Sequence, residues 1–353
     1  MSHPSALQST AQALLADGRG ILAADESFPT IGQRFQALDI PSTEENRRAY
    51  RELLFTAPGL NQFISGVILF DETIRQQIHG TPIPAWLAGQ GIIPGIKVDL
   101  GTIALAHFPG EMVTQGLDGL RERLAEYREL GARFTKWRAV ISIGERLPTA
   151  ACIVANAGPL AQFAALSQEA GLVPIVEPEI LMDGNHTLAR CEEVMTTTLQ
   201  MVFAALAMQR VVLEGLLLKT AMVLPGCESP RLAEPAAVAA ATLRCLRRTV
   251  PPAVPGIVFL SGGQSEVAAT ERLNAIGSAG LAPWPLSFSY GRALQDTALK
   301  TWAGAPAQVP AAQAALRHRA RCNHLAVQGK YSAAEESARS AAVRPRPRSR
   351  RCG

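Results

Sequence analysis

The stretch VPIVEPE, residues 173–179, runs through β-branched and aliphatic residues and closes with two carboxylates. Its apolar part is too short for an independent helix and has no polar face, which is typical of a strand buried on both sides of a parallel sheet. A charge in such a strand is costly to bury unless it is paired or used in chemistry. This stretch therefore predicts both a fold and the position of a site.

Seven other stretches share this pattern, at intervals of about 25 to 45 residues. They are GILAADE (20–26), ISGVILF (64–70), IIPGIKV (92–98), FTKWRAV (134–140), VLEGLLLK (212–219), GIVFLSG (256–262) and LSFSYG (286–291). The segments between them repeat apolar residues with helical period, as in 43–57, 116–130, 158–170 and 186–207. Thr43 is a suitable N-cap for the first of these, with acidic residues in the following turn.

Eight strands alternating with helices predict an α/β fold, a single-domain (βα)₈ TIM barrel. An open doubly wound sheet is the alternative, because one sequence does not give strand order. A nucleotide-binding version of that sheet is disfavoured, since no GxGxxG or GxxxxGK[ST] motif follows the first strand.

The distribution of charge and the spacing of the cysteines bear on possible partners and on the cellular compartment. Five arginines after Ala342 (344, 346, 348, 350 and 351) account for the net charge of +4, and without them the chain carries −1. We therefore expect no nucleic-acid partner, and an Arg/Pro-rich, disordered tail at 332–353 following a barrel at 1–331. The six cysteines form no CxxC pair, which favours reduced thiols in the cytoplasm. We expect no membrane span and no secretory signal, because neither pattern occurs in the sequence.

Polar side chains gather where the predicted strands end. They are Asp25, Glu26, Lys97, Asp99, Lys136, Arg138, Glu177, Glu179, Lys219, Ser261, Ser289 and Arg292. Because the carboxyl ends of barrel strands form the active-site face, we expect these side chains to converge there. Simple core ion pairs, such as Glu177 with Lys136, are the structural alternative.

Lys219 ends an aliphatic stretch, so its ammonium should be poorly solvated. Burial and a second cation such as Lys136 would both lower its pKa and release a nucleophilic amine. Glu177 or Glu179 could carry the protons that carbonyl addition requires. An iminium formed in this way lets a carbon–carbon bond break without a metal or another cofactor.

Two glycine-containing turns predict phosphate binding. Ser261-Gly262-Gly263 follows the seventh strand and Gly291-Arg292 the eighth, where barrels often hold a phosphate. Lys97, Arg138 and Ser27 could form a second basic pocket, which would suit a bisphosphate.

A metal-dependent aldolase or isomerase is the competing enzyme class. The six histidines (3, 79, 107, 186, 318 and 324) do not gather at strand ends, and we expect His186 in a surface loop.

The motifs together resemble those of class I fructose-bisphosphate aldolases, from about residue 10 to Tyr331. They are GILAADES (20–27), TEENRR (43–48), GVILFDET (66–73), GIKVD (95–99), TQGLDGL (114–120), KWR (136–138), PIVEPEIL (174–181), LEGLLLK (213–219), RRTVPPAVPGI (247–257), FLSGGQSE (259–266), FSYGRALQ (288–295) and QGKY (328–331). The resemblance implies reversible cleavage of fructose 1,6-bisphosphate to dihydroxyacetone phosphate and glyceraldehyde 3-phosphate, in glycolysis and gluconeogenesis. It also implies a cytoplasmic homotetramer acting on sugar phosphates, with no metal and no membrane partner.

The resemblance also implies a role for each site residue. Lys219 would form the Schiff base, Glu177 would carry protons, and Asp25 would deprotonate the C4 hydroxyl. Lys136 and Glu179 would form a charge pair beside the imine. The C1 phosphate would be held by Ser261, Gly262, Ser289, Gly291 and Arg292, and the C6 end by Ser27, Lys97 and Arg138.

Three departures from the family pattern are visible. Thr220 and Ala221 follow the lysine where the family has Pro and then Asn or Ser, which removes a rigid turn and a polar group. Phe28-Pro29 should change a loop at the edge of the pocket, with Thr30 supplying a hydroxyl in place of serine. The last tyrosine is Tyr331, whereas vertebrate members end in one. These departures motivate a third hypothesis, a binding or scaffold protein on an aldolase-like fold.

Overall fold

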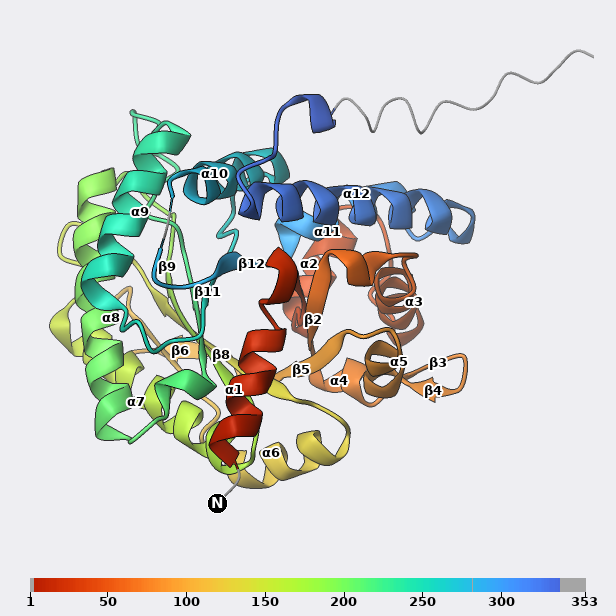
Figure 1. The fold of residues 1–353 in the computed structure, drawn as a ribbon, viewed down its shortest axis with the longest axis horizontal. Helices are drawn as coiled ribbons and strands as arrows, with labels where there is room; N and C mark the ends of the chain where they lie inside the picture. Colours follow the sequence, from red (N-terminus) through yellow and green to blue (C-terminus); the bar gives the residue numbers. More distant parts are fainter. Residues whose placement is uncertain (1–2, 281, 337–353) are drawn as a thin grey trace, which may run out of the picture.

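The computed structural model describes residues 3–280 and 282–336, and in this part of the chain eight parallel strands close into a barrel surrounded by helices (Figure 1). Around the barrel the order is β1-β12-β11-β10-β9-β8-β5-β2. These strands are β1 (Gly20–Ala24), β2 (Ile64–Leu69), β5 (Ile93–Lys97), β8 (Phe134–Ile141), β9 (Val173–Ile180), β10 (Leu217–Thr220), β11 (Ile257–Phe259) and β12 (Leu286–Tyr290). Because β1 pairs with both β12 and β2, the predicted TIM barrel is confirmed and the open sheet is excluded.

The helices lie outside the strands, and four of the predicted ones are present. The helices are α1 (His3–Ala13), α2 (Phe28–Gln36), α3 (Glu44–Phe55), α4 (Asp71–Ile74), α5 (Ile83–Gly89), α6 (Leu120–Glu129), α7 (Ala150–Glu169), α8 (Leu188–Met208), α9 (Pro235–Thr249), α10 (Glu266–Ser278), α11 (Arg292–Trp302) and α12 (Val309–Val327). The boundaries of α3, α6 and α8 differ little from those expected, whereas α7 begins at Ala150, well before the expected start at residue 158, and contains Pro159 in its interior. Thr43 caps α3 by accepting a hydrogen bond from Asn46 N, as predicted. Two small hairpins, β3 (Gln77–Ile78) with β4 (Thr81–Pro82) and β6 (Thr102–Ala104) with β7 (Met112–Thr114), complete the fold.

The sixth strand is shorter than the sequence suggests. Leu213–Gly215 forms a short 3₁₀ helix, and β10 begins only at Leu217. The Gln168 side chain accepts a hydrogen bond from Val212 N and donates to the carbonyls of Val212 and Gly215. The backbone before β10 therefore bonds to this side chain instead of to a neighbouring strand.

The expected loop at Phe28-Pro29 is instead the first turn of α2. Ser27 occupies the N-cap position, and Pro29 lies in the first turn, where its missing N–H costs no helical hydrogen bond. The residues that differ from the family pattern therefore start a helix at the edge of the barrel.

The N-terminal end of the barrel interior is filled with apolar side chains. Inward-facing residues at the starts of the strands form one cluster with Leu7, Ala11 and Leu14 at the N-terminus; its strand members include Ile21, Phe134, Ile175, Leu217 and Val258. Gly95 gives the Phe134 ring its space, because a Cβ at Gly95 would lie 2.3 Å from a ring carbon. The N-terminal segment that includes α1 thus closes this end, and open space in the barrel lies at the opposite end.

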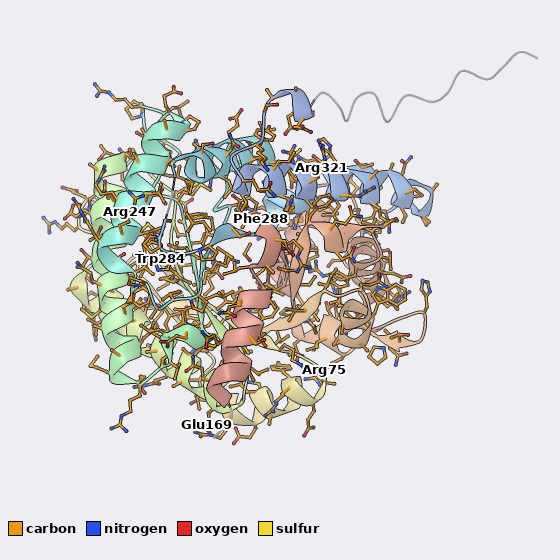
Figure 2. The ribbon with its side chains drawn as sticks, in the orientation of Figure 1. Arg75, Glu169, Arg247, Trp284, Phe288 and Arg321 are labelled. Carbon is orange, nitrogen blue, oxygen red and sulfur yellow. The ribbon has the colours of Figure 1, made fainter. Side chains whose placement is uncertain are left out.

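A second apolar layer lies between the strands and the outer helices. Trp137 stacks on Phe163 of α7 with ring centroids 5.6 Å apart. Figure 2 shows Phe288 inside the fold, whereas Arg75 and Glu169 extend from its periphery. Within the described chain, α7 is long and apolar enough to cross a membrane by composition, but half of this stretch is buried and it packs on β8 and β9. We interpret α7 as a core helix.

Candidate active site

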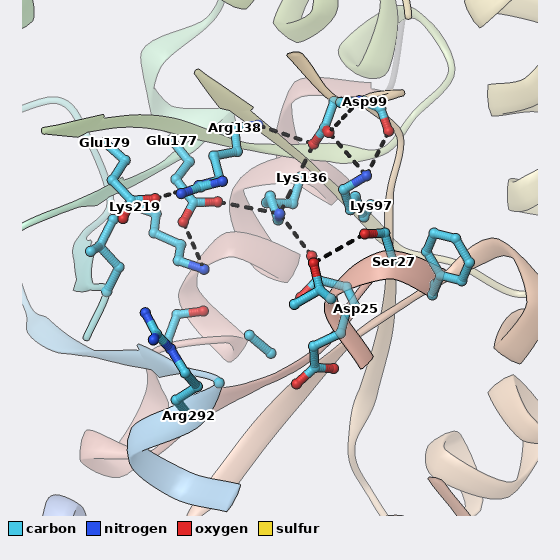
Figure 3. Close-up of a pocket in the computed structure, with 18 of the residues that line it drawn as sticks. Asp25, Ser27, Lys97, Asp99, Lys136, Arg138, Glu177, Glu179, Lys219 and Arg292 are labelled. Carbon is cyan, nitrogen blue, oxygen red and sulfur yellow. Dashed lines mark hydrogen bonds and ion pairs between the residues drawn. The ribbon is translucent and has the colours of Figure 1, made fainter. Parts of the chain in front are cut away.

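A cavity of about 570 Å³ opens at the carboxyl ends of the strands. All thirteen residues predicted for the site line it: Asp25, Ser27, Lys97, Lys136, Arg138, Glu177, Glu179, Lys219, Ser261, Gly262, Ser289, Gly291 and Arg292. Figure 3 shows the labelled charged side chains from different strands directed toward this common space. The predicted convergence of the strand ends is therefore present in the structure.

The alternation of side chains along each strand explains how the charges reach the cavity. On β8 the inward series begins with Phe134 in the apolar cluster, and Lys136 and Arg138 follow at steps of two residues. On β9 the same steps lead from Ile175 to Glu177 and Glu179. These four charged residues lie within their strands and not after the strand ends. They are one or two layers of side chains closer to the cavity than the apolar cluster at the N-terminal end of the barrel.

The side-chain amine of Lys219 is buried beside a carboxylate. Its side chain is 6% exposed, and Nζ lies 3.0 Å from Glu177 Oε1. Leu217 and Leu218 precede it in β10 and are both buried. The backbone of Lys219 is fixed in β10, and its side-chain amine extends to the cavity.

Lys136 lies among three carboxylates at the centre of the site. Its Nζ is 2.7 Å from Asp25 Oδ2, 3.4 Å from Glu177 Oε2 and 4.0 Å from Asp99 Oδ2. Burial alone would lower the pKa of Lys136, but these three carboxylates raise it above its usual value. Lys136 is therefore a permanent cation at neutral pH, and the predicted Glu177–Lys136 contact is present.

Asp25 lies on the other side of this lysine. Burial alone would raise the pKa of Asp25, but Lys136 and Lys219 outweigh it and lower the pKa below 3.8. Asp25 is therefore ionised at neutral pH and able to accept a proton or hydrogen bond from a substrate hydroxyl.

Glu179 pairs with Arg138, whereas the family resemblance implies a pair with Lys136. Arg138 Nε donates a charge-assisted hydrogen bond to Glu179 Oε2. Burial alone would lower the pKa of Arg138, and Glu179 raises it instead. The difference follows from position, because Lys136 lies one layer deeper on β8 and is already surrounded by Asp25, Glu177 and Asp99.

One wall of the cavity has the features of a phosphate site. Gly262 and Gly263 both have positive φ values, 55° and 89°, a conformation that glycine adopts without strain. Arg292 is the first residue of α11, so that helix directs its N-terminal N–H groups and positive dipole toward this wall. Among the described residues Arg292 forms no ion pair, so its guanidinium has no competing carboxylate.

The opposite wall holds the residues predicted for a second phosphate. Ser27 Oγ lies 3.1 Å from Thr30 Oγ1, which brings both hydroxyls to the edge of the cavity. Lys97 Nζ lies 3.0 Å from Asp99 Oδ1 and donates to the backbone oxygen of the same residue. A phosphate here would have to displace or share these contacts of Lys97.

Sequence reasoning missed Arg34 in the lining of the cavity. It lies on α2 and forms an ion pair of 2.5 Å with Glu26, whose other oxygen lies 2.8 Å from Arg51. No local pattern identifies Arg34, because it belongs to a helix and not to a strand end. Its ion-pair partner Glu26, two residues after the end of β1, was the available indication.

The donor set of the cavity is unsuited to a divalent metal. None of the described residues that line it is a histidine or cysteine, and its carboxylates lie against lysines or arginines. His186 lies in the predicted loop between β9 and α8, but the expectation of a surface position is wrong, since it is only 9% exposed. Burial lowers the pKa of His186, and the residue does not line the cavity.

Comparisons with known proteins agree with this geometry. The family model described as fructose-bisphosphate aldolase class-I matches residues 6–344. A probable fructose-bisphosphate aldolase class 1 from Xylella fastidiosa is 55% identical over 92% of this chain and 98% of its own length. The chloroplastic fructose-bisphosphate aldolase 1 of Chlamydomonas reinhardtii is 53% identical, over 94% of this chain and 88% of its own length. The solved fructose-bisphosphate aldolase of Plasmodium falciparum superposes with a TM-score of 0.92 at 49% identity, covering 93% of this chain and 96% of that one.

Proposed function

The chain belongs to the class I fructose-bisphosphate aldolase family, and from that premise we propose how its residues divide the work of reversible fructose 1,6-bisphosphate cleavage. The observation that carries the proposal is the buried Lys219 Nζ in contact with Glu177 Oε1 at 3.0 Å. A carbon–carbon lyase of this class needs an amine that can lose its proton to a neighbouring base and attack a ketone.

Glu177 carries the protons of imine formation. It accepts a proton from the Lys219 ammonium, the free amine adds to the C2 carbonyl, and the carbinolamine hydroxyl leaves as water after protonation by the same carboxyl. Lys136, at 3.4 Å from Glu177 Oε2, stabilises the carboxylate between these transfers. The product of this stage is an iminium linking C2 of the sugar to Lys219.

Asp25 then starts the cleavage. Its carboxylate takes the proton of the C4 hydroxyl, the C3–C4 bond breaks, and the bonding electrons move into the iminium to give an enamine. Glyceraldehyde 3-phosphate leaves, the enamine is protonated at C3, and water releases dihydroxyacetone phosphate from Lys219. The lowered pKa of Asp25 keeps this base ionised at neutral pH.

The two walls of the cavity determine the orientation in which the sugar bisphosphate binds. Ser261, Gly262, Ser289, Gly291 and Arg292 hold the C1 phosphate, which places C2 beside Lys219. Ser27, Lys97 and Arg138 receive the C6 end. Glu179 holds Arg138 in place through their ion pair.

Borohydride trapping tests the central claim. Reduction in the presence of dihydroxyacetone phosphate should attach the three-carbon unit to Lys219, and peptide mass spectrometry should locate it there. Lys219→Arg, which keeps the charge, should give no adduct and lower the rate of cleavage by about 10⁴-fold or more. An adduct on another lysine, or cleavage abolished by EDTA, would contradict the assignment and favour the metal-dependent alternative.

Three further properties complete the proposal. We propose a cytoplasmic homotetramer, with a barrel at 1–331 followed by a tail at 332–353. The free cysteines of the described chain support a reducing compartment, and the relatives include a cytosolic enzyme of Arabidopsis thaliana. Light scattering should give the mass of four 37.6 kDa chains, and a monomer mass would contradict this. The structure describes residues 332–336 of this tail, where Glu335 pairs with Arg321 and Glu336 with Arg319, so the expected disorder is wrong for these five residues. The expected disorder of residues 337–353 lies outside the described part of the chain.

A further inference from the structure

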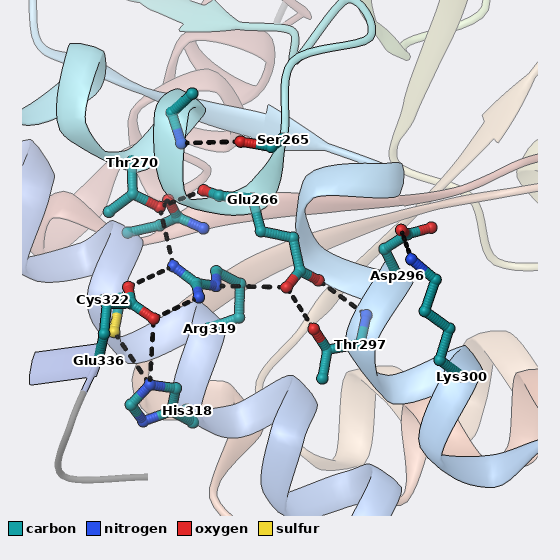
Figure 4. Close-up of polar contacts among 12 residues, drawn as sticks. Ser265, Glu266, Thr270, Asp296, Thr297, Lys300, His318, Arg319, Cys322 and Glu336 are labelled. Atoms are coloured by element: carbon teal, nitrogen blue, oxygen red, sulfur yellow. Dashed lines mark hydrogen bonds and ion pairs between the residues drawn. The ribbon is translucent and has the colours of Figure 1, made fainter. Parts of the chain in front are cut away.

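Three potential metal ligands meet on the outside of the barrel. His318 and Cys322 are one helical turn apart on α12, and Glu336 follows that helix (Figure 4). Cys322 Sγ lies 3.5 Å from His318 Nε2, and Glu336 Oε2 lies 4.0 Å from the same nitrogen. All three ligand atoms lie within 4.8 Å of one another, and none of these residues lines the catalytic cavity.

The spacing is close to that of a tetrahedral zinc site. With Zn–S near 2.3 Å and Zn–N near 2.0–2.1 Å, a tetrahedral angle puts sulfur and nitrogen about 3.5 Å apart. The Cys322–His318 separation has this value. Glu336 Oε2 has to approach the nitrogen by about 0.7 Å for a separation of about 3.3 Å, and it has to come within about 3.5 Å of the sulfur, from which it now lies no more than 4.8 Å away.

The hydrogen bonds of Glu336 hold the carboxylate in place and leave a position for a metal. Oε1 accepts from Arg319 Nη1 and from the Tyr331 hydroxyl, both at 2.7 Å, which occupies its two lone pairs. Oε2 accepts from Arg319 Nη2 at 2.7 Å and keeps its second lone pair. Partners of this kind orient a ligand and strengthen metal binding.

The local charges balance when an ion is present. A thiolate and a carboxylate together neutralise a divalent cation, and the buried Arg319 retains Glu266 at 3.8 Å as a counterion. Cys322 is fully buried, but the side chains of His318 and Glu336 are 14% and 25% exposed. An ion can therefore reach the cluster from the side of these two residues, where water can supply a fourth ligand.

We propose that His318, Cys322 and Glu336 bind one zinc ion, which ties the segment after α12 to the outside of the barrel. Thiolate, imidazole and carboxylate together suit zinc better than magnesium or calcium, which prefer oxygen ligands. Binding releases the thiol proton of Cys322 to solvent. The ion takes no part in sugar cleavage, since it lies outside the catalytic cavity.

Metal titration of the full-length protein tests the proposal. After removal of bound metal with a chelator, calorimetry should show one zinc ion per chain, and cobalt should give the near-ultraviolet charge-transfer band of a cobalt–thiolate bond. Cys322→Ser and His318→Gln should each weaken zinc binding by about 100-fold or more, because each removes a ligand. Borohydride trapping at Lys219 should proceed equally with and without zinc.

Cys227→Ser is the matched control, because Cys227 is an exposed free thiol away from the cluster. It should bind zinc and cobalt as the unmodified chain does. His318→Gln decides the question if the buried Cys322→Ser variant unfolds, which circular dichroism reports. Absence of zinc binding by the unmodified chain, or unchanged binding by His318→Gln, overturns the proposal.

Discussion

Glu177 Oε1 lies 3.0 Å from Lys219 Nζ, and both side chains are almost fully withdrawn from solvent. The two residues come from neighbouring strands, β9 and β10, of the barrel. A carboxylate held this close to a buried amine can take its proton and return it without a water intermediate. The proposed nucleophile and its proposed proton carrier are therefore in contact before any substrate binds.

Replacing Glu177 with Gln should separate substrate binding from imine formation. The amide keeps the shape but cannot accept a proton, so we expect kcat to fall by about 10²–10⁴-fold. The half-saturating concentration of substrate should change little, because the phosphate walls remain intact. Stopped-flow borohydride trapping measures the rate directly, and Glu193→Gln on the surface is the control. Unchanged trapping kinetics would assign the proton transfers to another group.

Asp25→Asn should change how stability depends on pH. The folded-state pKa of Asp25 is lowered, so its contribution to stability is present above pH 3.8 and is lost as the pH falls through the lowered value. At pH 7 the variant should unfold more easily by about 2–3 kcal/mol, since Lys136 keeps only Glu177 and Asp99 as partners.

Below pH 3.8 the unmodified chain loses this contribution as well, so the two unfolding free energies should converge. Denaturant titrations at several pH values measure the difference. Asp17→Asn, at an exposed aspartate, is the control for the loss of one carboxylate from the chain. A constant difference between Asp25→Asn and the unmodified chain across this range would contradict the ion-pair account.

Arg292→Ala should weaken binding of the C1 phosphate. A charge-assisted hydrogen bond to a phosphate contributes about 1.5–3 kcal/mol, so the half-saturating dihydroxyacetone phosphate concentration in the trapping assay should rise by about 10–100-fold. The adduct should still form on Lys219 at saturation, because the amine and Glu177 are unaffected. Arg121→Ala, which removes an exposed arginine, serves for comparison. An unchanged concentration dependence would place the phosphate elsewhere.

Thr220→Val should stabilise the fold. Thr220 is fully buried, and its Oγ1 has no hydrogen-bond partner among the described residues. Removing this hydroxyl should raise the free energy of unfolding by about 1 kcal/mol, as measured by urea denaturation. Thr242→Val is the matched case, because that equally buried hydroxyl accepts a hydrogen bond of 2.9 Å from Val223 N. Thr242→Val should be destabilising by about 1–3 kcal/mol, and equal effects of the two changes would refute the explanation.

The sequence by itself determined the alternation of eight strands with helices and the side chains that we expected to converge on one cavity. Buried parallel strands must be apolar along their length, so each appears as a short β-branched run, and the charges that interrupt these runs are visible without coordinates. All thirteen predicted site residues line the cavity, and the charged ones in or directly after the strands were found for this reason. The N-cap role of Thr43 could also be predicted from the sequence, because the capping hydrogen bond joins residues only three positions apart.

Apart from the Glu177–Lys136 contact, only the tertiary structure decided which charges pair. Lys136 meets Asp25, and Glu179 meets Arg138, because strand register and the layer of each residue set these distances. The same holds for Arg34 in the cavity wall, for the Gln168 bonds that shorten β10, and for Glu336 beside α12. Each of these contacts joins separate elements of the chain, and their spacing is fixed only when the helices and strands pack.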